Sequence, residues 1–197
     1  GVISMRQLGE LIACNKLEES QKYLHHLLQV AGHNHIMEFL LEVSFLYSTK
    51  AALFCWYSYK SIQFMDPKEI RGTLYISLDC LYKSQANKHV EKDYADEFNL
   101  LCNSYQIKET EMIRSRKIVS VLSEKMKVLQ KDKYKNVIPN GLEKLVRKEG
   151  QKGLRNYLSK MEIDEISPKL ILLLDAMRAA IQYSQIAEKS FGFKIEK

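Results

Sequence analysis

Helical periodicity of the apolar residues is the feature that most constrains this fold, because it extends along most of the chain. Residues 17–30 place their leucines on one helical face, and residues 168–189 carry an apolar stripe of Leu170, Leu174, Met177 and Ile181. Such spacing is typical of amphipathic helices and not of strands. Only 8 glycines and 3 prolines interrupt the 197 residues, and this scarcity favours helix over sheet. The sequence therefore predicts an all-α fold.

Breaks in the periodicity divide the chain into helices. Ser48 or Thr49 is a suitable N-cap for one helix, and Pro67 suits the first turn of the next. Gly150 and Gly153 make residues 149–153 the best candidate for a boundary between segments. We expect helices over residues 4–14, 17–30, 35–46, 50–64, 68–83, 94–102, 109–130, 142–148, 154–161 and 168–189.

The charge of the chain is basic but mixed in sign. The 30 basic and 24 acidic residues give a formal net charge of +6. A basic cluster at Lys125–Lys135 (KMKVLQKDKYK) contains one aromatic residue, which is a pattern that RNA-binding proteins also use. Cationic side chains near the C-terminus of a helix are also favoured by the helix dipole. A solvated face explains the cluster more simply, so we expect no nucleic-acid partner.

Residues that could support catalysis or metal binding do not form a recognisable constellation. The four cysteines, at positions 14, 55, 80 and 102, contain no CxxC pair and indicate reduced, small core residues of an intracellular protein. His25 and His26 point about 100° apart on a helix, which favours surface histidines over a zinc site. The phosphate-binding, dinucleotide-binding and serine-nucleophile motifs are absent from the sequence. We therefore predict no metal, no cofactor and no catalytic residue.

The chain has no apolar run long enough to suggest a membrane span. The longest run near the C-terminus is Leu170–Leu174, whereas a transmembrane helix needs about 20 apolar residues. We expect a soluble, cytoplasmic protein, or a domain of a larger one, which reaches membranes only through its partners.

Two polar stretches interrupt the helical pattern and are the best candidates for a contact surface. Ser84–Asp93 reads SQANKHVEKD, and Gln130–Tyr134 reads QKDKY. Each follows a long amphipathic helix, where an all-helical domain would present polar groups to a partner.

Several segments resemble the regulator of G-protein signalling (RGS) homology family, in the same order along the chain. Met37–Leu41 (MEFLL) resembles the F-x-x-F-L motif of the family, and Tyr59-Lys60 resembles its YK pair. The first polar stretch resembles the loop Q-A-x-K-x-V-N-x-D and matches it at Gln85, Ala86, Lys88, Val90 and Asp93. Residues 128–134 resemble L-M-E-K-D-S-Y and match it at Lys131, Asp132 and Tyr134.

This resemblance implies a fold and a division of the chain. The family forms a bundle of about nine helices, which here would occupy residues 35–150. Residues 1–34 would add N-terminal helices that pack on the bundle, and residues 151–197 would form a C-terminal helical extension.

The resemblance also implies a partner, the α subunit of a heterotrimeric G protein (Gα). Such domains donate no catalytic group and instead hold the switch loops of Gα in the shape of the transition state. The implied Gα-binding residues are Ser48, Thr49, Glu91, Asp93, Val128, Asp132, Lys133 and Asn136. Glu91 stands where the family has an asparagine that contacts the catalytic glutamine of Gα. A carboxylate cannot donate a hydrogen bond, so we expect weak or absent GTPase activation.

A second hypothesis keeps the fold without the G protein. The domain would then be a protein–protein scaffold that binds other partners or neighbouring domains, for example through the helices of residues 4–30 and 154–189.

Overall fold

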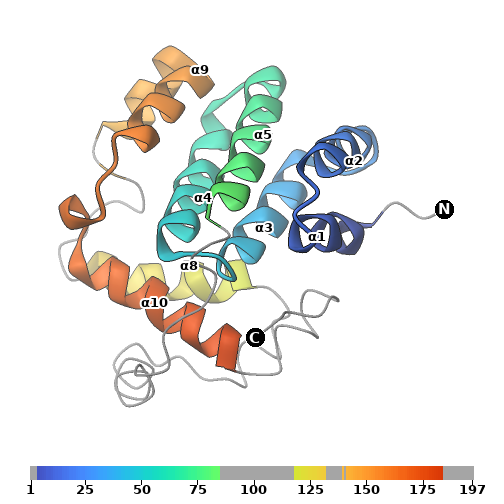
Figure 1. The fold of residues 1–197 in the computed structure, drawn as a ribbon. Helices are drawn as coiled ribbons and strands as arrows, with labels where there is room; N and C mark the ends of the chain where they lie inside the picture. Colours follow the sequence, from blue (N-terminus) through green and yellow to red (C-terminus); the bar gives the residue numbers. More distant parts are fainter. Residues whose placement is uncertain (1–3, 85–117, 132–138, 140, 184–197) are drawn as a thin grey trace.

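The computed structural model describes residues 4–84, 118–131, 139 and 141–183, and all regular elements among them are helices (Figure 1). The prediction of an all-α fold is therefore confirmed for these residues. The expected helix at 94–102 and the polar stretch after Ser84 lie outside them. The elements are α1 (Met5–Ala13), α2 (Leu17–Val30), α3 (His33–Ser44), α4 (Thr49–Ser61), η1 (Ile62–Phe64), α5 (Pro67–Lys83), α8 (Ile118–Lys131), α9 (Leu142–Ser159), η4 (Ile163–Glu165) and α10 (Pro168–Tyr183).

Local sequence signals place several of these helix ends. Ser48 is the N-cap of α4, and its hydroxyl accepts a hydrogen bond from the Ala51 N–H at 2.9 Å. Asp66 caps α5 by accepting from the Glu69 N–H at 2.9 Å, with Pro67 at the first helical position. The cap at Ser48 and the first-turn position of Pro67 were both expected, because these signals act within two or three residues along the chain.

The helix α4 contacts α3, α5, α9 and α10, and it lies beside α5 in Figure 1. Its residues Trp56 and Tyr57 are fully buried, together with Phe45 from the turn before it. One continuous cluster of buried side chains extends from Leu8 in α1 to Met177 in α10. The core therefore includes helices from all three of the expected segments of the chain.

The hairpin of α1 and α2 packs beside α3 and α5. The Tyr82 hydroxyl of α5 lies 2.8 Å from Ser20 Oγ and 3.2 Å from the Leu11 carbonyl oxygen, so it contacts both helices of the hairpin. The Tyr23 hydroxyl accepts from the Ser4 N–H at 2.7 Å, and this bond ties the start of α1 to α2. These contacts fix the hairpin through side chains as well as through its apolar face.

The break expected at residues 149–153 falls at Gly150, where α9 is kinked. The helix α9 continues from Leu142 to Ser159, and Gly150 alone has non-helical angles, with φ 61° and ψ −141°. The Glu69 carboxylate of α5 accepts from the Gln151 N–H at 2.7 Å. An acceptor of this kind satisfies a donor that the interruption leaves without a helical partner. The helix is thus interrupted within the expected range 149–153, and the Glu69 carboxylate of α5 bonds to the backbone just after the interruption.

The helix α10 packs across α4 and α8 (Figure 1). Its buried residues include three members of the predicted stripe, Leu170, Leu174 and Met177. Leu173 and Ala176 are also fully buried, so the apolar face of the helix is wider than that stripe. None of the described helices is both long and apolar enough to cross a membrane.

Candidate functional site

The structure places the side chains of only two of the predicted Gα-binding residues, Ser48 and Thr49. Val128 lies within α8 (Ile118–Lys131). The remaining predicted residues lie outside the part of the chain that the structure describes, namely Glu91, Asp93, Asp132, Lys133 and Asn136. The candidate site is therefore built from the turn between α3 and α4, the part of the predicted surface that can be described.

This turn, residues 45–49, tightens the end of α3 and then starts α4 directly. The Leu46 N–H donates to the Val43 carbonyl at 2.9 Å, and the Tyr47 N–H donates to the Ser44 carbonyl at 3.1 Å. Ser48 is extended, with φ −158° and ψ 160°, as an N-cap residue usually is. The Ser48 carbonyl accepts from the Ala52 N–H at 3.0 Å as α4 begins, whereas the carbonyls of Phe45 and Tyr47 face α10 and accept from one of its side chains.

Arg178 of α10 occupies those carbonyls. Its Nε donates to the Phe45 carbonyl oxygen at 3.3 Å, and its Nη2 donates to the Tyr47 carbonyl oxygen at 3.2 Å. Its Nη1 donates to Thr49 Oγ1 at 3.0 Å. The arginine is only 7% exposed. A cation at the C-terminus of a helix is favoured by the helix dipole, so Arg178 acts as a distant C-cap for α3.

Asp175 completes the arrangement from the same helix. The Thr49 hydroxyl donates to the Asp175 carboxylate while it accepts from Arg178. Asp175 and Arg178 are three residues apart, so they lie on one face of α10. This contact, formed by Asp175 and Arg178 with the turn 45–49, is called the α10 clamp below.

The predicted contact residues Ser48 and Thr49 are buried, and their hydroxyl groups are already hydrogen-bonded within the protein. Ser48 and Thr49 are each 9% exposed. The Ser48 hydroxyl bonds to the Ala51 N–H, and the Thr49 hydroxyl bonds to both residues of the clamp. The family resemblance predicted Ser48 and Thr49 as contact residues of this turn, but it did not predict that Asp175 and Arg178 would bind to it. The available signal was an acidic and a basic residue at i, i+3 spacing beside the apolar stripe of α10.

Buried ionisable groups near the centre of the fold are held in their neutral forms. Burial raises the pKa of the Tyr47 hydroxyl well above its ordinary value, and burial likewise raises the pKa of the Cys55 thiol. Burial raises the pKa of Cys80 to about 11. A reactive cysteine needs a lowered pKa and access to solvent, so neither thiol has the properties of a nucleophile.

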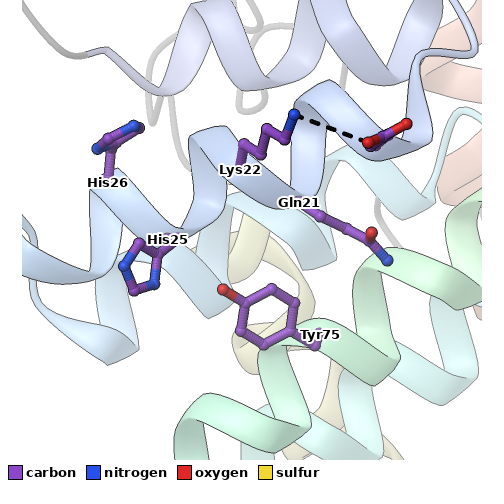
Figure 2. Close-up of a pocket in the computed structure, with 6 residues that line it drawn as sticks. Gln21, Lys22, His25, His26 and Tyr75 are labelled. Atoms are coloured by element: carbon purple, nitrogen blue, oxygen red, sulfur yellow. Dashed lines mark ion pairs between the residues drawn. The ribbon is translucent and has the colours of Figure 1, made fainter.

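A surface hollow of about 550 Å³ lies between α2 and α5. Figure 2 shows Gln21 and His25 on the side of α2 that faces Tyr75 of α5, whereas His26 points away. Lys22 is directed to Glu18, with 3.7 Å between Nζ and Oε1. Within the described residues, no three His, Cys, Asp or Glu side chains gather as a metal site would require. The hollow is thus an open depression whose exposed lining is mostly apolar and whose lysine is paired with Glu18.

Comparison with known proteins adds no family assignment. No protein-family model matches the chain, and no curated protein or solved structure is significantly similar to it.

Proposed function

We propose that this chain is a protein-interaction domain of the RGS type, which binds Gα but has little or no effect on GTP hydrolysis. The sequence support for Gα as the partner is the pair of segments at 84–93 and 128–134 that resemble the family. The structural observation that supports weak activation is the α10 clamp, which buries Ser48 and Thr49.

The physical argument concerns how switch loops are held. An activator of this class must present donors and acceptors that fix the loops of Gα in the geometry of the transition state. At the α3–α4 turn, the carbonyls of Phe45 and Tyr47 and the hydroxyl of Thr49 already bond to Arg178. A partner would have to replace these charge-assisted bonds, each of which contributes about 1.5–3 kcal/mol.

The second argument concerns Glu91. The residue at this position of the family contacts the catalytic glutamine of Gα and can both donate and accept, whereas a carboxylate only accepts. Its charge would also lie near a phosphoryl group that is already negative. The α3–α4 turn and Glu91 therefore lack the groups that acceleration requires, while Lys131, Asp132 and Tyr134 match the family and support binding through this segment.

A second candidate is a scaffold that does not bind Gα. The same clamp favours it, because the clamp covers Ser48 and Thr49, two of the implied Gα-binding residues. Partners would then dock on other elements of the helical surface.

Binding to purified Gα loaded with GDP, or with GDP and aluminium fluoride, separates the two functions. We expect binding that prefers the aluminium fluoride form, with a single-turnover hydrolysis rate within about twofold of Gα alone. Asp132→Ala should weaken that binding, whereas Asp164→Ala, at an exposed position in η4, should not. Acceleration of tenfold or more would refute the weak-activator proposal. Absence of binding in both nucleotide states would refute Gα as the partner and leave the scaffold.

A further inference from the structure

Among the described helices, α9 carries the highest net positive charge. Its five basic and two acidic residues give +3, which is half of the formal charge of +6 on the whole chain. All five cationic side chains are exposed. The other side of the helix is held on the core by the buried residues Leu142, Val146, Leu154 and Leu158. Figure 1 shows α9 at the edge of the molecule, on the far side of α5 from the α1–α2 hairpin.

Four of the five cations of α9 have no ion-pair partner among the residues that the structure describes. Arg147 is the exception, because its Nη2 lies 3.1 Å from Glu143 Oε1 and its guanidinium carbon lies 4.5 Å from the centre of the Phe64 ring. Glu149, the other acidic residue of the helix, lies beside Gly153 and pairs with none of the described cations. The four unpaired cations are called the α9 basic face below, and they are Lys144, Lys148, Lys152 and Arg155.

Helix stability does not account for the α9 basic face. Cations are favoured by the helix dipole only in the last turn, and the last turn of α9 contains no basic residue. Lys144 and Lys148 are four residues apart, and Lys152 and Arg155 are three apart, so each half of the helix brings two like charges together. Like charges at helical spacing destabilise a helix, whereas opposite charges stabilise it. An anionic partner would neutralise this repulsion.

The composition of the face indicates which anionic partner it fits. Three of its four cations are lysines, whose flexible stems carry compact charges and suit a diffuse anionic surface better than a single fixed phosphate. Binding of single-stranded nucleic acid also uses aromatic side chains on which the bases stack, and the face contains none. The described residues of α9 expose no large apolar side chain, so contact with a bilayer would be limited to the headgroups. The face therefore fits electrostatic contact with the anionic headgroups of a membrane.

We propose that the α9 basic face binds reversibly to the surface of a membrane that contains anionic phospholipids. The sequence predicted that the chain reaches membranes only through its partners, and this face provides a direct contact. In the bound orientation α9 lies against the headgroups, and the α1–α2 hairpin, on the other side of α5, is turned away from the bilayer (Figure 1). The contact is independent of whether the chain binds Gα.

The strength of this contact follows from the number of cations. Each cation close to an anionic membrane surface raises the affinity about fivefold. The four together should give an affinity at least about 100-fold higher for anionic than for neutral membranes. The Debye length falls from about 10 Å at 0.1 M salt to about 3 Å at 1 M salt. Binding should therefore weaken steeply as salt is added.

Co-sedimentation of the full chain with lipid vesicles measures this binding. One set of vesicles is phosphatidylcholine alone, and the other contains about 30% phosphatidylserine. The direct variant combines Lys148→Gln with Lys152→Gln, because glutamine is uncharged and a good helix former. Two controls accompany it. Lys148→Arg with Lys152→Arg keeps the charge of the face, and Lys16→Gln with Lys22→Gln removes the same charge from exposed positions at α2.

The wild type should prefer the phosphatidylserine vesicles at least about 100-fold at low salt. The glutamine variant of α9 should bind them about 10- to 30-fold more weakly, whereas both controls should stay within about threefold of the wild type. Far-UV circular dichroism verifies that each variant is folded. The salt dependence of the wild type is a test that requires no variant, because an electrostatic contact should be lost in about 1 M salt.

Four results would overturn the inference. They are equal binding to both kinds of vesicle, binding that persists in high salt, no loss of affinity in the glutamine variant of α9, and an equal loss in the α2 control. Tighter binding to a short DNA duplex or to a single-stranded oligonucleotide than to the vesicles, at the same salt, would also overturn it and assign the face to nucleic acid. Because no G protein is present in these experiments, none of the outcomes bears on the proposed function.

Discussion

Gly150→Ala tests whether the kink of α9 is held by a tertiary contact. Gly150 has φ +61° and ψ −141°, a conformation that L-residues rarely adopt, and a residue forced into such a region costs about 1–3 kcal/mol. A Cβ at this position would lie 2.8 Å from Glu69 Oε2 and 2.9 Å from Glu69 Cδ. The carboxylate would have to move, and this would break its bond to the Gln151 N–H.

The backbone strain and the lost hydrogen bond together set the change in the free energy of unfolding. Loss of a hydrogen bond to a charged acceptor costs about 1.5–3 kcal/mol. Alanine also restricts the unfolded chain, which offsets about 0.4–1 kcal/mol of the loss. We therefore expect Gly150→Ala to lower the free energy of unfolding by about 2–5 kcal/mol. Gly32→Ala is the control, because a Cβ at Gly32 meets no atom within 4 Å, and it should cost less than about 1 kcal/mol.

Equilibrium unfolding in urea, followed by far-UV circular dichroism, measures these differences. Glu69→Ala alone removes the bond to Gln151 and also the obstacle to a new Cβ. The double variant should therefore be more stable than the sum of the two single losses predicts, by about 1.5–3 kcal/mol. A Gly150→Ala protein within about 0.5 kcal/mol of the wild type, or strictly additive losses, would refute this account of the kink.

Three further predictions concern ionisable groups and the N-terminal hairpin. Because Cys80 has an ordinary pKa of 9.0 and a folded pKa of about 11, its neutral form stabilises the fold below pH 9, and this contribution is lost as the pH rises from 9 to 11. In urea unfolding, the free energy of unfolding should fall by up to about 2–3 kcal/mol over this pH range. The fall should be smaller in Cys80→Ala, and an identical pH profile for that variant would contradict the assignment to Cys80. In native protein at pH 8, iodoacetamide should modify exposed Cys14 before Cys80, which should react about 100-fold more slowly than an ordinary thiol. The fully buried Cys55 should be modified only on unfolding. Peptide mass spectrometry measures the order, and modification of Cys80 or Cys55 before Cys14 would contradict the prediction. Tyr82→Phe removes the hydroxyl that contacts Ser20 and Leu11, and should cost about 1 kcal/mol, with faster hydrogen exchange in α1 and α2 but not in α9; equal acceleration in α9 would count against a local role.

The helices could be predicted from the sequence because their signals are local. The predicted range of α2, residues 17–30, agrees with the structure. The caps at Ser48 and Asp66 each bond to a backbone group three residues away. Periodicity and capping require no knowledge of distant residues, and the same signals therefore indicate most of the described helices correctly.

The candidate site could be predicted only in part, because its contacts join residues that are far apart in the sequence. The turn at Ser48 and Thr49 was found from its position between two helices, yet its burial depends on Arg178, which is 129 residues from Thr49. A sequence pattern shows that Asp175 and Arg178 share a helical face, but it does not show which element that face meets. A family resemblance carries residue roles only as far as the surrounding surface is the same, and here the C-terminal helix covers it.

By itself the sequence determined that the described chain is helical, where most of those helices begin and end, and which faces are apolar, because each of these depends on interactions within a few residues. Only the tertiary structure decided that Glu69 bonds to the Gln151 N–H beside the kink of α9, 82 residues away, and that α10 covers the α3–α4 turn. Both arrangements consist of charged side chains that reach backbone groups of distant helices. Such pairings depend on how the helices pack, and helix packing brings together residues that no local pattern connects.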